Sequence, residues 1–217
     1  MQVMIDADDV TLIGDLALPS EAKATVIFAH GSGSSRHSPR NHAVARVLQR
    51  AGLGTLLFDL LTREEEAGEA RTGRLRFDID FLARRLVAAT RWLRQQPRQD
   101  GARLGYFGAS IGAAAALTAA AHADLHIGAV VSRGGRPDLA AAALPRVHAP
   151  TLLIVGENDD LVRVLNEQAA ARMTCAREIA IVPGATHLFE EAGALDHVAR
   201  LAAHWFARHL LTDTPAP

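Results

Sequence analysis

One serine in this sequence stands in a pattern that is typical of a nucleophile. Ser110 is the centre of the motif Gly-x-Ser-x-Gly, residues 108–112, in the stretch LGYFGASIGAAAALTAAA. An apolar run precedes the motif and a helix-forming alanine run follows it, which is the strand–turn–helix setting that such a serine requires. The glycines fit a sharp turn with a strained serine backbone, because such a turn leaves no room for nearby Cβ atoms. The alternative is a structural junction of small residues, and we favour the chemical interpretation.

A serine hydroxyl becomes a good nucleophile only when a base takes its proton, so a histidine should accompany Ser110. His187 is favoured among the ten histidines, because it follows the strand-like run IAIV and a Pro-Gly turn and precedes the last helix. That position lies at the carboxyl edge of the expected sheet, where sites of α/β proteins form. His37 and His42, near an early loop, remain alternatives. Six others sit on or beside expected helices or at the opposite end of the sheet.

An acidic residue is needed to hold the histidine in the right tautomer. The run LLIVGENDDLV ends a strand in two aspartates, Asp159 and Asp160, and both precede His187 in the chain. Asp159 is expected to orient His187, and Asp160 is expected to cap the helix that follows. Asp138, in the loop after the preceding strand, is a weaker alternative that helix capping also explains.

A glycine-rich turn, His-Gly-Ser-Gly at residues 30–33, follows an early strand. Its backbone amides can face Ser110, and together with the amide of Ile111 they would supply the two donors that stabilise an oxyanion. The helix that begins after Ser110 directs positive charge density at the same point. These pieces appear at strand ends and in an order that suits acyl transfer.

Short apolar runs alternate with helical periodicity along the chain. Most of the runs are continuously apolar, which fits strands buried on both faces of a parallel sheet. The first, VTLIGDLALP, alternates and is expected at the sheet edge. The alternation predicts a three-layer α/β domain with a mostly parallel, twisted sheet over residues 1–211, and a disordered tail at 212–217. No separate cap domain is expected, because the chain between Val131 and Pro150 has room for about one helix. The seven expected strands begin at residues 10, 24, 54, 103, 127, 150 and 177.

The composition excludes several other classes of protein. The 217 residues are 49% hydrophobic and 22% charged with a net charge of −1, so no nucleic-acid partner and no anionic membrane surface are expected. Cys175 is the only cysteine, which excludes an intrachain disulfide and disfavours a cysteine-based metal site. No apolar segment reaches membrane-spanning length and the amino terminus carries no signal pattern. We therefore predict a cytoplasmic protein that acts on a small molecule without a metal or cofactor. The sequence leaves open whether the protein forms a homodimer.

Five segments together resemble the α/β-hydrolase superfamily, and within it the small dienelactone hydrolase-like group. They are FAHGSGSSRHSPRN, GASIG, SRGGRPDLA, VGENDDLV and PGATHLFEE, and the resemblance covers nearly the whole chain. Relatives of this bacterial subgroup are also found fused to phosphoribosyltransferase domains. The resemblance implies a triad of Ser110, Asp159 and His187, with the amides of Ser32 and Ile111 as oxyanion donors. Dienelactone hydrolases use a cysteine nucleophile, so a serine at position 110 favours ordinary ester chemistry over a dienelactone substrate.

Arginines near the expected site are further candidates for contacts with a substrate. Arg133 and Arg136 follow a strand at the sheet edge of the triad, and Arg36 belongs to a basic cluster beside the glycine-rich turn. They could bind a carboxylate or phosphate, although pairing with nearby acids or solvation explains them equally well. The polar run 62–76 is the one long insertion, and it is either a flap over the site or a solvated loop.

These residues predict a serine hydrolase that cleaves a small ester, lactone or thioester through an acyl-enzyme. An acyltransferase or thioesterase with the same residues is the alternative among enzymes. A non-catalytic scaffold of the same fold, which binds a small ligand, is the alternative from another class, and a full set of reactive residues argues against it.

Overall fold

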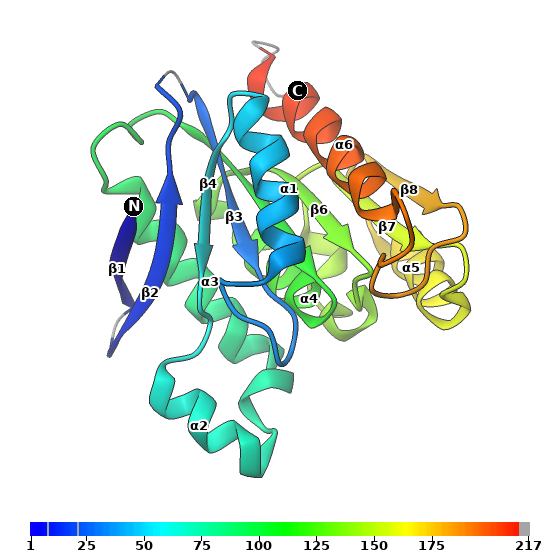
Figure 1. The fold of residues 1–217 in the computed structure, drawn as a ribbon, viewed down its shortest axis with the longest axis horizontal. Helices are drawn as coiled ribbons and strands as arrows, with labels where there is room; N and C mark the ends of the chain where they lie inside the picture. The colour runs from blue at the N-terminus through cyan, green and yellow to red at the C-terminus, as the bar shows by residue number, and fades with distance from the viewer. Residues whose placement is uncertain (8, 21, 213–217) are drawn as a thin grey trace.

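An eight-stranded sheet runs through the centre of the molecule (Figure 1), whose computed structural model describes residues 1–7, 9–20 and 22–212. The strand order is β1-β2-β4-β3-β5-β6-β7-β8. The pairings of β1 with β2 and of β2 with β4 are antiparallel, and the other five are parallel. The strands are β1 (Gln2–Ala7), β2 (Val10–Ala17), β3 (Ala24–Ala29), β4 (Gly54–Phe58), β5 (Arg103–Ala109), β6 (Ile127–Arg133), β7 (Thr151–Gly156) and β8 (Arg177–Val182).

Helices cover both faces of this sheet, as Figure 1 shows. Two helices lie on one face, three lie on the other, and α2 lies beyond the carboxyl ends of the central strands. The first face carries α1 (Pro39–Arg50) and α6 (Ala194–Phe206), the second carries α3 (Ile79–Arg94), α4 (Ile111–Ala120) and α5 (Asp160–Arg172), and α2 spans Arg63–Thr72. The three-layer α/β fold with a mostly parallel sheet is therefore confirmed.

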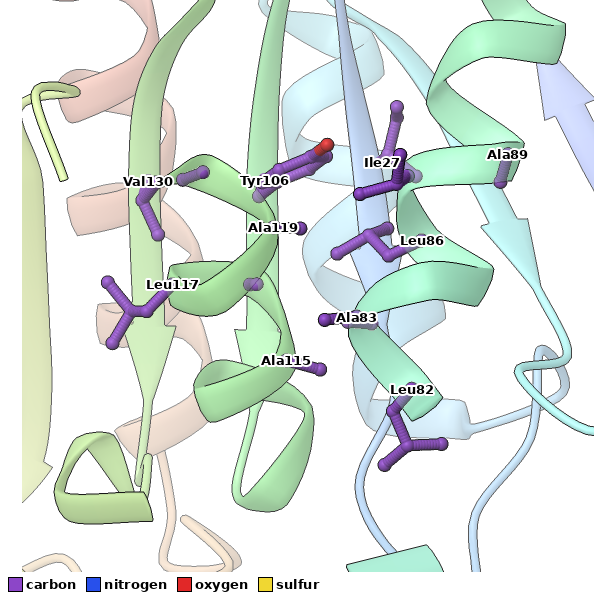
Figure 2. Close-up of a cluster of buried hydrophobic side chains, with 14 of the residues drawn as sticks. Ile27, Leu82, Ala83, Leu86, Ala89, Tyr106, Ala115, Leu117, Ala119 and Val130 are labelled. Carbon is purple, nitrogen blue, oxygen red and sulfur yellow. The ribbon is translucent and has the colours of Figure 1, made fainter. Parts of the chain in front are cut away.

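The core on the second face depends on small residues in α4. Ala115 and Ala119 of α4 face Ala83 and Leu86 of α3 across a short gap (Figure 2). Alanine side chains let the two helices approach closely, and fully burying a leucine such as Leu86 is worth about 1.5–3 kcal/mol. Beneath them the hydroxyl of Tyr106 lies 2.7 Å from that of Thr90, so the polar end of this buried ring is satisfied. This packing fixes α4, and with it the turn at its amino end.

The sequence-based prediction misses β1 and misplaces the sheet edge. β1 pairs with β2 along its whole length, so β1 and not β2 lies at this edge of the sheet, and β8 lies at the other edge. Only Ile5 and Ala7 of β1 are buried, and its other residues are exposed or partly exposed. Of the tail predicted to be disordered, Thr212 is described, and its carbonyl accepts a hydrogen bond from the Arg103 guanidinium. Residues 213–217 lie outside the described part of the chain.

The polar run 62–76 forms a helix and a short 3-10 turn. Thr62 caps α2 in a capping box with Glu65, and Glu65 also accepts a hydrogen bond from Arg85 of α3 at 2.8 Å. Near the other end, the carboxylate of Glu69 is 1% exposed and accepts the backbone N–H groups of Leu75 and Arg76. The insertion is thus an ordered helix that hydrogen bonds tie to the domain.

No cap domain follows β6, as predicted. The described chain between β6 and β7 forms two single-turn 3-10 helices, Pro137–Ala140 and Leu144–Arg146, and no larger unit. The carboxyl edge of β5, β6 and β7 is therefore left uncovered from this side.

Candidate active site

Ser110 stands alone between β5, which ends at Ala109, and α4, which begins at Ile111. Its backbone has φ 52° and ψ −121°, a conformation that costs a residue with a side chain about 1–3 kcal/mol. The turn is held by hydrogen bonds on both sides: the Ser110 N–H donates to the carbonyl of Arg133 at 3.1 Å, and its carbonyl accepts the N–H of Arg136 at 3.2 Å. The strained turn places the half-buried serine at the carboxyl edge of the sheet.

The two glycines of the motif are required by close backbone contacts. A Cβ atom at Gly108 would lie 2.4 Å from the Cα of Ala113, and one at Gly112 would lie 2.2 Å from the carbonyl oxygen of Ala29. Neither contact leaves room for a side chain. The second glycine therefore lets the start of α4 lie directly against the end of β3, which leads into the glycine-rich turn.

His187 and Asp159 are hydrogen-bonded to each other. The distance between His187 Nδ1 and Asp159 Oδ2 is 2.7 Å, and the side chains are 39% and 14% exposed. Asp159 occupies the N-cap position of α5, yet its side chain makes no capping hydrogen bond. A carboxylate at Nδ1 favours the tautomer that carries its proton there, which leaves Nε2 free to act as a base.

The other two aspartates have different partners. Asp160 lies in the first turn of α5, is 84% exposed in its side chain and pairs with Arg163 at 3.1 Å. It does not occupy the capping position that the sequence suggests for it. Asp138 accepts two hydrogen bonds from the Arg136 guanidinium, at 2.9 and 2.8 Å, and this interaction raises the pKa of Arg136.

Ser110 and His187 both lie against the segment Arg133–Gly134. Ser110 donates its amide to Arg133, and a Cβ atom on Gly134 would lie 3.2 Å from the His187 carbonyl oxygen and 3.6 Å from its Cε1. Gly134 itself has a φ of 51°. The serine and the histidine, 77 positions apart in the chain, thus lie against neighbouring residues of the same segment at the sheet edge.

The loop that carries His187 is held by a residue that the sequence analysis misses. Glu191 accepts the N–H of Thr186 at 3.0 Å and its hydroxyl at 2.5 Å, and these bonds lower the pKa of the Glu191 carboxyl. Phe189 is 1% exposed, with a φ of 56°. Its buried ring and the Glu191 contact fix the loop on either side of His187.

The glycine-rich turn is anchored by His30. The Nε2 of this imidazole accepts the N–H of Leu60 at 3.1 Å, so the Nδ1–H donates to the carbonyl of Gly31 at 2.9 Å. Burial lowers the pKa of His30, which keeps this arrangement neutral. A Cβ on Gly31 would lie 3.3 Å from the Cβ of Ser110, so the turn with Ser32 runs beside the serine.

The amide of Ile111 completes the set of residues that the sequence singles out. Ile111 is the first residue of α4, where a helix provides no internal acceptor for the N–H group. Donors at a helix start and in the neighbouring turn are suited to a negatively charged oxygen.

The other two candidate arginines, Arg36 and Arg133, differ in their partners. Arg36 pairs with Asp59 and, at 3.4 Å, with Asp15, and its own N–H also donates to Asp59. Arg133 is 8% exposed, and within the described residues its Nε has no hydrogen-bond partner. Burial, with a smaller effect of nearby Arg40, lowers the pKa of Arg133 to about 10. Burying a cation without an acidic partner costs free energy. Arg133 bears this cost next to the serine turn.

A cavity of about 1020 Å³ opens on the other side of the glycine-rich turn. Its lining includes Ser32, Asp59 and the start of α2 from Arg63 to Glu66, but neither Ser110 nor His187. Within the described ranges, the group of potential metal ligands that lies close together comprises Asp15, His37 and His42 and includes neither Ser110 nor His187. No helix among the described residues is both long and apolar enough to span a bilayer.

The chain is similar to proteins of several organisms. It is 55% identical to dienelactone hydrolase from Anabaena variabilis, whose crystal structure matches it with a TM-score of 0.95 over 97% of each chain. It is 15% identical to Est1E of Butyrivibrio proteoclasticus with bound ferulic acid, with a TM-score of 0.82 over 97% of this chain and all of that one, which is a likeness of fold alone.

A protein of Mycobacterium tuberculosis, provisionally named a phosphoribosyl transferase, is 53% identical over 215 residues, 99% of this chain. The chain spans about half the length of that curated relative, 48%. The model of the dienelactone hydrolase family matches residues 12–210. The chain therefore belongs to the dienelactone hydrolase family, a family of α/β-fold hydrolases.

Proposed function

We propose that this hydrolase cleaves a small carboxylic ester or lactone by acyl transfer to Ser110. The observation that carries the proposal is the 2.7 Å hydrogen bond between His187 and Asp159 at the sheet edge where the strained Ser110 turn lies. Strain at a residue with a side chain is characteristic of functional sites. A histidine held by a carboxylate beside a serine is the arrangement that activates a hydroxyl.

In the proposed reaction, His187 Nε2 takes the proton of the Ser110 hydroxyl as its oxygen attacks the carbonyl carbon. The negative charge that develops on the carbonyl oxygen is stabilised by the amides of Ser32 and Ile111. Protonated His187 then gives its proton to the departing alcohol, and Asp159 stabilises the imidazolium. Water repeats the sequence on the acyl-enzyme and releases the acid.

We further propose that the acid or alcohol part of the substrate is negatively charged. Arg133 supports this, because it is a buried guanidinium without an acidic partner in the described residues, next to the serine turn. Arg36 also remains a candidate, but its pairing with Asp59 and Asp15 suits a role in ordering the glycine-rich turn. The phosphoribosyl transferase name belongs to a relative about twice as long, and we assign that activity to no residue here.

A fluorophosphonate probe tests the nucleophile. We expect one covalent adduct in the intact mass of the wild type and none in Ser110→Ala, while Ser20→Ala, a change at an exposed serine, keeps the adduct. Treatment with an alkylating reagent should leave hydrolysis unchanged, because Cys175 lies just before β8 and away from the serine turn. The thiol should also react slowly, because it is buried and burial raises its pKa. An adduct that persists in folded Ser110→Ala, or a wild type that is never labelled, would refute the serine mechanism and favour a ligand-binding scaffold.

A further inference from the structure

A second cluster of reactive side chains lies outside the proposed catalytic residues. Asp15 comes from β2, His37 from the loop between β3 and α1, and His42 from the first turn of α1. One ligand atom of each side chain lies within 4.8 Å of the ligand atoms of the other two. The three residues thus come from three parts of the fold: a strand, a loop and the start of a helix.

The sheet itself directs Asp15 to this place. Leu12, Gly14 and Leu16 of β2 are buried, and the two leucines pack in the core on the α3 side. Because side chains alternate along a strand, Asp15 points to the opposite face, which α1 covers. Asp15 also pairs in register with Leu57, next to the carboxyl end of β4, and so lies near the loop that starts α1.

The donor set suits a divalent transition metal. Two imidazoles and one carboxylate are ligands that zinc binds in tetrahedral sites, with a water as the fourth ligand. Bonds of about 2.1 Å place such ligands about 3.4 Å apart, so separations of at most 4.8 Å require shifts of roughly 1 Å. His37 is exposed and His42 is half-buried, so rotation of these side chains can supply the movement.

The neighbours of the cluster leave the ligand atoms available. In the described part of the chain, neither imidazole donates or accepts a side-chain hydrogen bond, and the ion pair of Asp15 is the one with Arg36 Nε at 3.4 Å. Arg36 also pairs with Asp59. One arginine against two carboxylates leaves a net charge of −1 around the site, which favours a cation, and a guanidinium that holds a ligating carboxylate is a typical outer-shell contact.

We propose that Asp15, His37 and His42 form a binding site for a zinc ion or a similar divalent transition metal. The ion would fasten the β3–α1 loop to β2. The same loop carries Ser32, but the site shares no residue with Ser110, His187 and Asp159, so the proposal is independent of the proposed function. Its expected role is to stabilise the loop, not to take part in bond cleavage.

Calorimetric titration of the chelator-treated 217-residue chain with zinc chloride tests the proposal. We expect one equivalent of zinc to bind and the midpoint of thermal unfolding to rise with it. His42→Ala, His37→Ala and Asp15→Asn should each weaken zinc binding at least tenfold, and the metal-free variants should unfold at the temperature of the metal-free wild type. His122→Ala, a change at an exposed histidine, should bind as the wild type does.

His187→Ala separates this site from the proposed catalytic pair, which could also attract zinc. The variant should keep the affinity and the thermal shift if the ion binds at Asp15, His37 and His42. Absence of binding by the wild type would overturn the proposal. So would binding that His187→Ala removes and that folded His42→Ala retains.

Discussion

Three aspartates lie within or next to the loops at the carboxyl edge of the sheet, and their partners separate their roles. Asp159 holds His187 Nδ1, Asp160 pairs with Arg163, and Asp138 pairs with Arg136. An amide at position 159 would keep the shape but favour the wrong tautomer of His187, a change that costs about 10⁴-fold in turnover in serine proteases. We expect Asp159→Asn to lose several orders of magnitude in kcat. Steady-state hydrolysis of an activated ester measures this loss.

Asp160→Asn and Asp138→Asn are the matched controls for that variant. Each should stay within about tenfold of the wild type, or about 1.4 kcal/mol in activation free energy. A crippled Asp138→Asn beside a mild Asp159→Asn would move the acid of the triad to β6, and the roles of Ser110 and His187 would stand.

Arg133 makes a separate prediction about substrate charge. Charge-assisted hydrogen bonds are worth about 1.5–3 kcal/mol, so Arg133→Met should raise KM for a monoester of a dicarboxylic acid at least tenfold. KM for the matched neutral diester should hardly change. Thermal stability should change little, since the substitution removes a buried charge that has no acidic partner in the described residues, and a methionine side chain can still pack near the ring of Phe189, which lies 5.9 Å from the guanidinium. Equal effects on both esters, or the same loss in Arg146→Met, which alters an exposed arginine, would contradict a role in anion binding.

Single residues were predictable where a motif demands a residue type. The Gly-x-Ser-x-Gly motif, the last-strand histidine and the aspartate after β7 are such cases, and the structure brings His187 and Asp159 into contact. The contact of Thr186 with Glu191 and the pairing of Arg36 with Asp59 were not predictable, because each depends on which loops meet in space. The residue types alone do not show which loops come into contact.

At the scale of the elements, the stability of α2 and of the turn after it depends on one buried carboxylate, that of Glu69. Burial of Glu69 favours its protonated form, but hydrogen bonds from Arg76, Leu75 and Thr72 outweigh that effect and lower the pKa from 4.5 to about 2. A carboxyl whose pKa is lower in the folded state stabilises the fold above its unfolded pKa, and this contribution is lost as the pH falls. We expect α2 and the turn after it to open progressively as the pH drops from about 4.5 toward 2.

Hydrogen exchange of residues 63–77 measures this opening. Glu69→Gln should exchange faster already at neutral pH and should lose the acid-dependent step. Glu64→Gln, a change at an exposed position of the same helix, should behave as the wild type does. If the acid-dependent increase in hydrogen exchange persisted in Glu69→Gln, the protonation of another carboxyl would cause it.

The junction of β3 with α4 gives a second prediction for an element. Gly112→Ala would place a Cβ 2.2 Å from the Ala29 carbonyl oxygen and 2.5 Å from that of His30. Both neighbours are backbone atoms, so the start of α4 must move, and we expect a loss of about 1–3 kcal/mol in unfolding free energy. The displaced Ile111 amide should reduce kcat as well. Denaturant unfolding and ester kinetics measure the two effects.

Gly68→Ala is the control for that substitution. Its Cβ would meet nothing within 4 Å on α2, so this change should be neutral or stabilising by up to about 1 kcal/mol. If Gly112→Ala were as well tolerated as Gly68→Ala, the close packing of α4 on β3 would not be what fixes the serine turn.

Elements were predictable from the sequence where their residues form an apolar run or an apolar stripe. The strands β3 to β7 are buried along most of their length, and β8 keeps the run Ile-Ala-Ile-Val although most of its residues are exposed. The helices α3, α4 and α6 follow from their apolar residues. The prediction misses β1 because Gln2 and Asp6 leave it without a continuous apolar run. α2 escapes because its stability comes from a capping box and from contacts of Glu65 and Glu69 with distant groups. Ser38 caps α1 and Pro39 is its first residue, both of which are residue types typical of a helix start.

At the scale of the whole molecule, the absence of a cap domain in the described chain limits the substrates. Single-turn 3-10 helices connect β6 and β7, and α2 lies beyond the carboxyl ends of the central strands (Figure 1). Most residues that line the cavity next to Ser32 are polar or charged, including Asp59 and the residues from Thr62 to Glu66, although Val10, Ile13 and Leu61 also face it. An acyl chain that entered it would lie against charged as well as apolar groups and would gain less than in an apolar tunnel.

This architecture predicts how the rate depends on acyl chain length. In an apolar tunnel each added CH₂ group is worth about 0.8 kcal/mol, or about fourfold in kcat/KM. Here we expect kcat/KM for p-nitrophenyl esters to stay level or fall from butanoate to decanoate, measured below the concentrations at which the esters aggregate. A rise of about fourfold per CH₂ would mean that an apolar channel forms when substrate binds. The same series in Ser110→Ala gives the background rate, so that hydrolysis outside the proposed site is subtracted at every chain length.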